Sequence, residues 1–124
     1  MDITPALAEG SLVIEAYGDG GFRVAGKRIE GSIIITPEAV YPWNTEGGGV
    51  TAEGLKPVLD AAKDIDILLV GSGRSLEPIP SVLKNLLREQ GIGADPMDTG
   101  AACRTYNVLL SEDRRVAVAL KAID

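Results

Sequence analysis

The feature that most constrains the fold is an apolar run closed by glycines, Ile67-Leu68-Leu69-Val70 followed by Gly71-Ser72-Gly73. A short apolar run without polar alternation is typical of a strand buried on both faces. We therefore place residues 65–70 at the centre of a sheet. The glycines allow a sharp turn at the end of this strand, and the next helix is expected only from about Pro80. The sequence thus predicts a long, exposed loop over residues 71–79.

Turn signals divide the N-terminal third into short strands. Residues 11–17 mix β-branched and aromatic side chains and end at a Gly-Asp-Gly-Gly turn, which predicts a hairpin with residues 22–24. After a second turn, residues 28–36 contain Ser32-Ile33-Ile34-Ile35-Thr36, which predicts a third, well buried strand. Two prolines make residues 39–43 at best an edge strand or a bent strand. A loop is predicted over residues 44–49.

The middle of the chain contains two predicted helices. Helical spacing of apolar residues predicts the first from Thr51 to about residue 63, although Pro57 argues for a start nearer Gly54. The second is expected to begin at Pro80 and stop at Gly91. Its apolar stripe consists of Val82, Leu83, Leu86 and Leu87.

The sequence of the C-terminal third predicts an edge strand at residues 92–97, a helix capped by Asp98 or Thr99, and a final strand at residues 115–123. Strands separated by helices favour parallel pairing, whereas the opening hairpin and the final strand supply antiparallel members. We predict one α/β domain over residues 1–124. It has a mixed sheet with flanking helices and an N-terminal β-hairpin subdomain.

Composition excludes several classes of function. With 18 acidic and 12 basic residues the formal net charge is −6, which opposes nucleic-acid binding. The chain has no histidine, and this removes Ser-His-Asp and Cys-His catalysis and His-ligated zinc. Its one cysteine, Cys103, cannot form an internal disulfide. We therefore expect no metal and no cofactor, and we assign no catalytic residue.

The sequence also predicts no membrane insertion. Its apolar runs are shorter than the roughly 20 residues that a membrane-spanning helix needs. The N-terminal Met-Asp-Ile-Thr-Pro lacks the pattern of a secretory signal or a mitochondrial presequence. A cytoplasmic location is expected.

A candidate binding site follows from the predicted sheet. If the strands ending at Val70 and Met97 are parallel neighbours, the loops after them leave from one edge, where open α/β sheets collect ligands. A helix N-terminus there, with nearby arginines, suits a small anion or carboxylate. The candidate residues are Gly71, Ser72, Gly73, Arg74, Asp98, Thr99, Cys103 and Arg104. The alternative is that the glycines serve tight turns, Arg104 pairs with a local acid and Cys103 belongs to the core.

Two single residues have open interpretations. Cys103 would be a nucleophile only if a helix N-terminus or a nearby cation lowered its pKa. The helix start at Thr99 and Arg104 could provide both, and an aspartate such as Asp98 would then have to act as base. A buried, inert cysteine is the other interpretation. Trp43 is either a core residue under the first helix or an aromatic anchor in a protein interface. A dinucleotide fingerprint is excluded, because its third glycine would fall at Leu76 and no helix follows directly.

Two stretches together carry a family resemblance: residues 67–73, and Met-Asp-Thr-Gly-Ala-Ala-Cys-Arg-Thr-Tyr-Asn-Val-Leu over residues 97–109. The chain resembles the Mth938-like family, formerly a domain of unknown function, which includes a mitochondrial complex I assembly factor. The resemblance covers residues 10–120 and implies a three-layer α/β fold. It also implies association with other proteins, because mitochondrial members bind assembly proteins at the inner membrane and an enzymatic activity is generally not established.

We therefore predict a non-enzymatic protein-interaction domain, with a role in assembly of membrane respiratory complexes implied by the resemblance. It would present residues 71–79, residues 98–107 and Trp43 to a protein partner, and a homodimer is left open. The alternative is a small-molecule or anion-binding domain, or a hydrolytic one. It would use a pocket around residues 71–74 and 98–104, so the question of an enzymatic activity also stays open.

Overall fold

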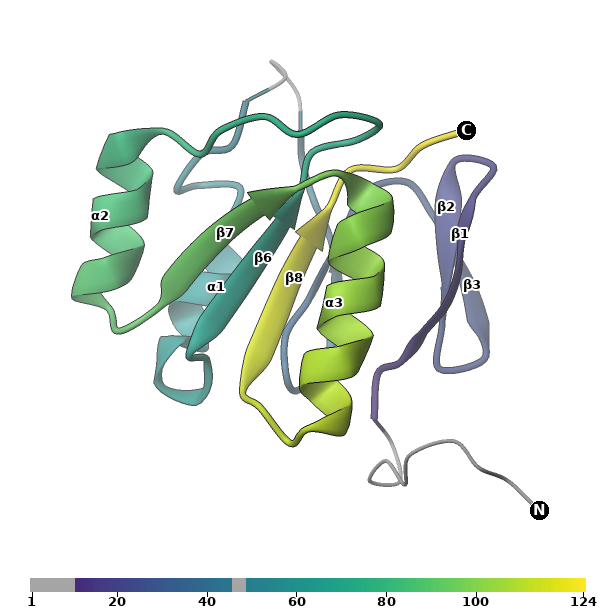
Figure 1. Cartoon of the computed structure of the whole chain (residues 1–124), viewed down its shortest axis with the longest axis horizontal. Helices are drawn as coiled ribbons and strands as arrows, with labels where there is room; N and C mark the ends of the chain where they lie inside the picture. The colour runs from purple at the N-terminus through teal and green to yellow at the C-terminus, as the bar shows by residue number, and fades with distance from the viewer. Residues whose placement is uncertain (1–10, 46–48) are drawn as a thin grey trace.

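The computed structural model describes residues 11–45 and 49–124. These residues form a three-stranded sheet, a five-stranded sheet and three α-helices (Figure 1). The elements in chain order are β1 (Ile14–Gly18), β2 (Gly21–Val24), β3 (Lys27–Glu30), β4 (Ile33–Ile35), β5 (Val40–Pro42), α1 (Lys56–Asp60), the 3₁₀ helix η1 (Ala62–Asp64), β6 (Ile67–Gly71), α2 (Ser81–Glu89), β7 (Gly93–Met97), α3 (Thr99–Ser111) and β8 (Val116–Leu120). Within the predicted loop over residues 44–49, residues 46–48 lie outside the described residues.

The three-stranded sheet is an antiparallel meander built on two short turns. Asp19 and Gly20 have φ angles of 54° and 78°, and Ala25 and Gly26 have φ angles of 49° and 82°. Two consecutive positive φ angles define type I′ turns, which match the twist of the paired strands. The predicted hairpin is confirmed. The buried strand predicted at residues 32–36 is confirmed as β4. The separate strand β3 was not predicted: the chain turns at Gly31 (φ 84°), and β3 and β4 join different sheets.

The five-stranded sheet has the order β5-β4-β8-β6-β7. β6 is parallel to both neighbours, whereas β4 is antiparallel to β5 and β8. The mixed sheet and the edge positions of β5 and β7 are confirmed. The central place expected for residues 65–70 needs correction: β6 is internal, but β8 is the middle strand and all five of its residues are buried.

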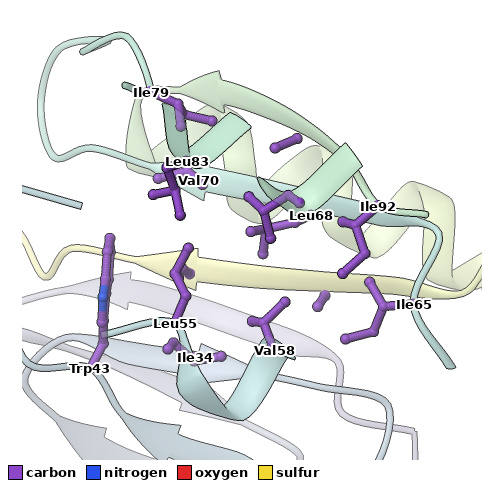
Figure 2. Close-up of a cluster of buried hydrophobic side chains, with 14 residues drawn as sticks. Ile34, Trp43, Leu55, Val58, Ile65, Leu68, Val70, Ile79, Leu83 and Ile92 are labelled. Carbon is purple, nitrogen blue, oxygen red and sulfur yellow. The ribbon is translucent and has the colours of Figure 1, made fainter. Parts of the chain in front are cut away.

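The domain has three layers (Figure 1). Helices α1 and α2 form the first layer, the five-stranded sheet forms the second, and α3 with the three-stranded sheet forms the third. On one face a buried cluster joins the five-stranded sheet to α1 and α2, and it includes Ile34, Val58 and Leu68 (Figure 2). On the other face a second cluster joins the sheet to α3 and the meander, and it includes Phe22, Leu69 and Tyr106. The predicted three-layer fold is confirmed.

The helix boundaries confirm two predictions and correct two details. α3 begins at Thr99 with Asp98 as its cap, and α2 begins just after Pro80, as expected. The first helix begins at Lys56 and not at Thr51, so that Pro57 occupies the first turn, where its missing N–H costs no hydrogen bond. Val82 is not part of the buried stripe of α2, because it is 83% exposed. No helix within the described ranges is long and apolar enough to span a membrane.

Candidate functional site

The carboxyl ends of β6, β7 and β8 meet at one edge of the sheet, and Thr99 joins the segments that follow them. The Thr99 N–H donates to the Gly73 carbonyl oxygen at 2.8 Å, and the Gly73 N–H donates to Thr99 Oγ1 at 2.9 Å. The Thr99 hydroxyl in turn donates to the Lys121 carbonyl oxygen at 2.8 Å. Thr99 is fully buried. Residues 71–74 and 98–101 are therefore side by side, and direct bonds fasten them together.

Gly71 permits the close approach of α3 to the sheet. A Cβ at this position would lie 2.9 Å from Leu120 Cδ2, 3.0 Å from Thr99 Cα and 3.1 Å from Ala102 Cβ. Contacts this short displace the neighbouring atoms, and the Thr99 atom belongs to the backbone. Gly71 is thus required for packing.

Ser72 holds the loop after β6 in a defined shape. Its hydroxyl lies 2.7 Å from the Ser75 carbonyl oxygen and 3.1 Å from that of Met97, and it accepts from the Glu77 N–H at 2.8 Å. Ser72 itself is only 6% exposed. The loop is therefore internally bonded although residues 74–78 are all exposed.

Arg74 and Leu76 project from this loop. Leu76 is 58% exposed. The structure shows no ion pair or hydrogen bond between the exposed guanidinium of Arg74 and another described residue. Glu77, the residue after Leu76, has its Oε2 3.6 Å from Lys121 Nζ. The loop therefore offers one cation and one large apolar side chain on a bonded framework.

The N-terminus of α3 uses part of its hydrogen-bonding capacity inside the protein. Asp98 Oδ1 accepts from the Ala101 N–H at 2.8 Å, and the Thr99 N–H is bound to the loop. A helix leaves its first four N–H groups without helical partners, and two of the four are satisfied here. Asp98 also places a carboxylate where an anion would bind.

Arg104 and Tyr17 meet over the first turns of α3. Arg104 is exposed, and its Nη1 donates to the Tyr17 hydroxyl at 3.3 Å. The same hydroxyl lies 2.6 Å from the position that a Cβ of Gly100 would occupy. Arg104 therefore contacts the meander, and the local acid expected as its partner does not form an ion pair with it in the described residues.

Cys103 lies on the inner side of α3, beside Arg104. Its side chain is 3% exposed and belongs to the cluster between α3 and the sheet. Burial raises the pKa of the Cys103 thiol to about 12, and the opposing effect of Arg104 on this pKa is smaller. A thiol with so high a pKa supplies little thiolate at neutral pH, which favours the inert interpretation.

Trp43 lies within the other apolar cluster, near Leu55 and Ile34 (Figure 2). It is 4% exposed, as expected of a core residue under α1. Its indole N–H has no hydrogen-bond partner within the described ranges. Trp43 is far too buried to contact a partner in this conformation.

The segment Arg104-Thr105-Tyr106-Asn107 has a role that the sequence did not reveal. The Tyr106 hydroxyl donates to the Leu12 carbonyl oxygen at 2.9 Å, and the Asn107 side chain binds both backbone groups of Ile14. With the contact between Arg104 and Tyr17, three of four consecutive residues fasten the N-terminal strand to α3. No local pattern predicts such partners, because they lie about 90 residues away in the chain.

The sequence profile of a family described as "Protein of unknown function (DUF498/DUF598)" matches residues 14–121. The chain belongs to this family. A *Xenopus tropicalis* relative, "NADH dehydrogenase [ubiquinone] 1 alpha subcomplex assembly factor 3", is 34% identical over 111 residues, which are 88% of this chain. The chain spans 60% of the length of that relative.

Solved structures of the family share the fold. A crystal structure of a *Bartonella henselae* protein, described as an outer membrane protein, is 45% identical with a TM-score of 0.88, and the match covers 93% of this chain and 98% of that one. The solution structure of a *Bordetella pertussis* protein, described as a Mth938-like domain, is 30% identical with a TM-score of 0.82. That match covers 98% of this chain and 92% of the other. The Mth938-like resemblance is confirmed.

Proposed function

We propose that this chain is a non-enzymatic interaction domain that assists the assembly of a membrane respiratory complex and binds its protein partner through the loop between β6 and α2. The observation that carries the proposal is the exposure of Arg74 and Leu76 on a loop that Ser72 holds in shape. The assembly role rests on the name of the *Xenopus* relative.

The shape of the loop favours binding for an energetic reason. A bonded loop loses less conformational entropy when it binds than a loop that must first be ordered. Arginine is also over-represented among the residues that dominate interface energies. In a chain of net charge −6, an exposed arginine without an ion-pair partner further favours an acidic partner surface.

The start of α3 extends the same edge. Gly73 and Thr99 bind each other directly, so a partner seated on the loop can also reach exposed residues of α3 such as Arg104. Trp43 is not part of the proposed surface, because it is buried. The anion-binding or hydrolytic alternative has less support, since Asp98 and Thr99 bind backbone groups and the Cys103 thiol is buried.

The test compares affinity purification of the wild-type chain with Arg74→Glu, from detergent-solubilised membranes. A matched control is Arg88→Glu, which makes the same charge change at an exposed position of α2. We expect a respiratory-complex subunit, or a protein that assembles one, to be recovered with wild type and Arg88→Glu. Recovery with Arg74→Glu should fall at least about tenfold, as expected for the loss of about 1.4 kcal/mol. Equal recovery with all three chains would contradict the proposed surface.

A further inference from the structure

A second surface lies at the opposite edge of the five-stranded sheet, where β8 begins and α3 ends (Figure 1). Two hollows adjoin there, one of about 400 Å³ beside the end of α3 and one of about 250 Å³ between β5 and α1. Glu38 and Asp64 line both hollows. The two hollows together therefore form one elongated depression, which we call the Glu38–Asp64 groove.

The walls of the groove are partly apolar. Beyond Glu38 and Asp64, the larger hollow is lined by accessible apolar side chains of Leu12, Pro37 and Leu110, and the smaller one by Tyr41 and Pro57. Each hollow thus offers apolar side chains next to the shared carboxylates of Glu38 and Asp64. This arrangement matches an extended peptide segment in which apolar residues flank a basic residue. Burial of such residues would supply most of the binding energy.

The charges of the groove are unevenly paired. Two cations of its lining already have acidic partners. The Arg115 guanidinium donates to the Asp66 carboxylate at 2.7 and 3.0 Å, and Lys56 Nζ lies 2.7 Å from Asp60 Oδ2. Within the described residues, the carboxylates of Glu38, Asp64 and Asp113 form no ion pair, although Asp64 is close enough to contribute to the raised pKa of Arg115. Arg114 is the remaining cation of the lining. The groove therefore has an excess of unpaired negative charge.

Asp113, just after α3, departs from two residue preferences that hold at the end of a helix. It follows the last turn of α3 with a φ of 62°, at a position where glycine is favoured. It also places a carboxylate at the negative end of the helix dipole, where a cation is favoured. Local preferences therefore do not account for this aspartate, which lines the larger hollow.

The spacing of these carboxylates fits an organic cation better than a metal ion. In the part of the chain that the structure describes, no three acidic side chains are close enough together to hold a metal. A lysine or arginine side chain needs only one or two carboxylates at its tip, and its aliphatic stem packs on apolar surface.

We propose that the Glu38–Asp64 groove binds an extended segment of a partner protein in which a lysine or arginine lies between apolar residues. The basic group lies between Glu38 and Asp64, and the apolar residues occupy the two hollows. This surface goes beyond the proposed function, because it lies at the other edge of the sheet and uses neither Arg74 nor Leu76.

The test is a titration of the ¹⁵N-labelled full chain, followed by amide chemical shifts. The probe is the peptide acetyl-Ser-Leu-Val-Lys-Val-Leu-Ser-amide, and the matched peptide has Glu in place of Lys. We expect the Lys peptide to shift the amide signals of Glu38, Asp64 and Val116 and to bind at least about tenfold more tightly than the Glu peptide. The difference should shrink between about 0.05 M and about 0.5 M salt.

Charge reversal locates the binding. Glu38→Lys with Asp64→Lys should remove the preference for the Lys peptide, and Glu38→Gln with Asp64→Asn serves the same purpose if the first variant does not fold. The control, Glu53→Lys with Glu89→Lys, makes the same charge change at other exposed positions and should leave the preference intact. Arg74→Glu should leave it intact too, so failure here is distinguishable from failure of the loop surface.

Four results obtained with the unshortened chain would overturn the proposal. They are equal binding of both peptides, no shift at about 1 mM peptide, an unchanged preference in the reversed variant, and shifts at the groove that depend on protein concentration alone. The last result would show that a second copy occupies the groove. Binding of the Lys peptide only to a chain without residues 2–10 would likewise overturn it, because the chain itself would then be the occupant.

Discussion

The side-chain amide of Asn107 pairs with the backbone of Ile14 as a neighbouring strand would. Its Oδ1 accepts from the Ile14 N–H at 3.0 Å, and its Nδ2 donates to the Ile14 carbonyl oxygen at 2.7 Å. Ile14 begins β1, whose other edge pairs with β2. One side chain of α3 thus satisfies both backbone groups of Ile14 at the outer edge of β1 and fastens the meander to α3.

Asn107→Ala should therefore destabilise the protein by about 2–4 kcal/mol, because two backbone groups of the buried Ile14 lose their partners. The free energy of unfolding, measured by urea denaturation, checks this value. Val108→Ala is the control, since Val108 is the next residue and is 55% exposed. It should change stability by no more than about 0.5 kcal/mol. Equal effects of the two substitutions would show that the Asn107 bonds contribute nothing to stability.

Gly71→Ala should destabilise the protein by about 1–3 kcal/mol, because the new methyl group would lie 3.0 Å from the backbone of Thr99. Gly93→Ala is the matched control in the neighbouring strand. Its Cβ would come no closer than 3.9 Å to another residue, so we expect a neutral or slightly stabilising effect of less than about 1 kcal/mol. Thermal unfolding of the two variants measures the difference. A loss at Gly93 as large as that at Gly71 would mean that close packing is not the cause.

The features that sequence predicted well depend on neighbouring residues. Asp98 caps α3 through a bond three residues ahead, and the hairpin follows from the turn at Asp19 and Gly20. In each case the partner lies within a few residues. Local spacing therefore contains the information that the structure uses.

The features that sequence missed depend on distant residues. The separate strand β3 was missed because β3 pairs with β2, whereas β4 pairs with β8, more than 80 residues later in the chain. Glu38 and Asp64 come together at the groove although they are far apart in the chain. The parallel pairing of β6 and β7, which brings residues 71–74 beside residues 98–101, was expected, but the bonds of Arg104 to Tyr17 and of Thr99 to Lys121 could not be predicted. These contacts follow from tertiary packing, which one sequence does not specify by periodicity.

Cys103 should react slowly with thiol reagents in the folded protein. With a pKa of about 12 against an ordinary 9.0, the thiolate fraction at pH 8 is lower by a factor of about 10³. The rate of labelling by a chromogenic disulfide in buffer and in denaturant measures this difference, with Cys103→Ala as the blank. Labelling of the native protein should also accelerate about tenfold per pH unit while the fold persists. A native rate within about tenfold of the denatured rate would revive the reactive interpretation.

Trp43→Phe should cost less stability than the size of the lost ring suggests. The substitution removes apolar area, but it also removes an indole N–H that has no partner within the described ranges. A buried donor without a partner costs about 1–3 kcal/mol, so the two effects should nearly cancel and leave a change of about 1 kcal/mol or less.

Two further substitutions test that cancellation, with unfolding followed by circular dichroism because Trp43 is the one tryptophan of the sequence. Trp43→Ala removes the packing as well and should cost about 3–5 kcal/mol. Tyr106→Phe removes a hydroxyl that does have a partner, the Leu12 carbonyl oxygen at 2.9 Å, and should cost about 1 kcal/mol. If Trp43→Phe costs clearly more than Tyr106→Phe, the indole N–H must be satisfied in solution, and a bound water is then the simplest partner.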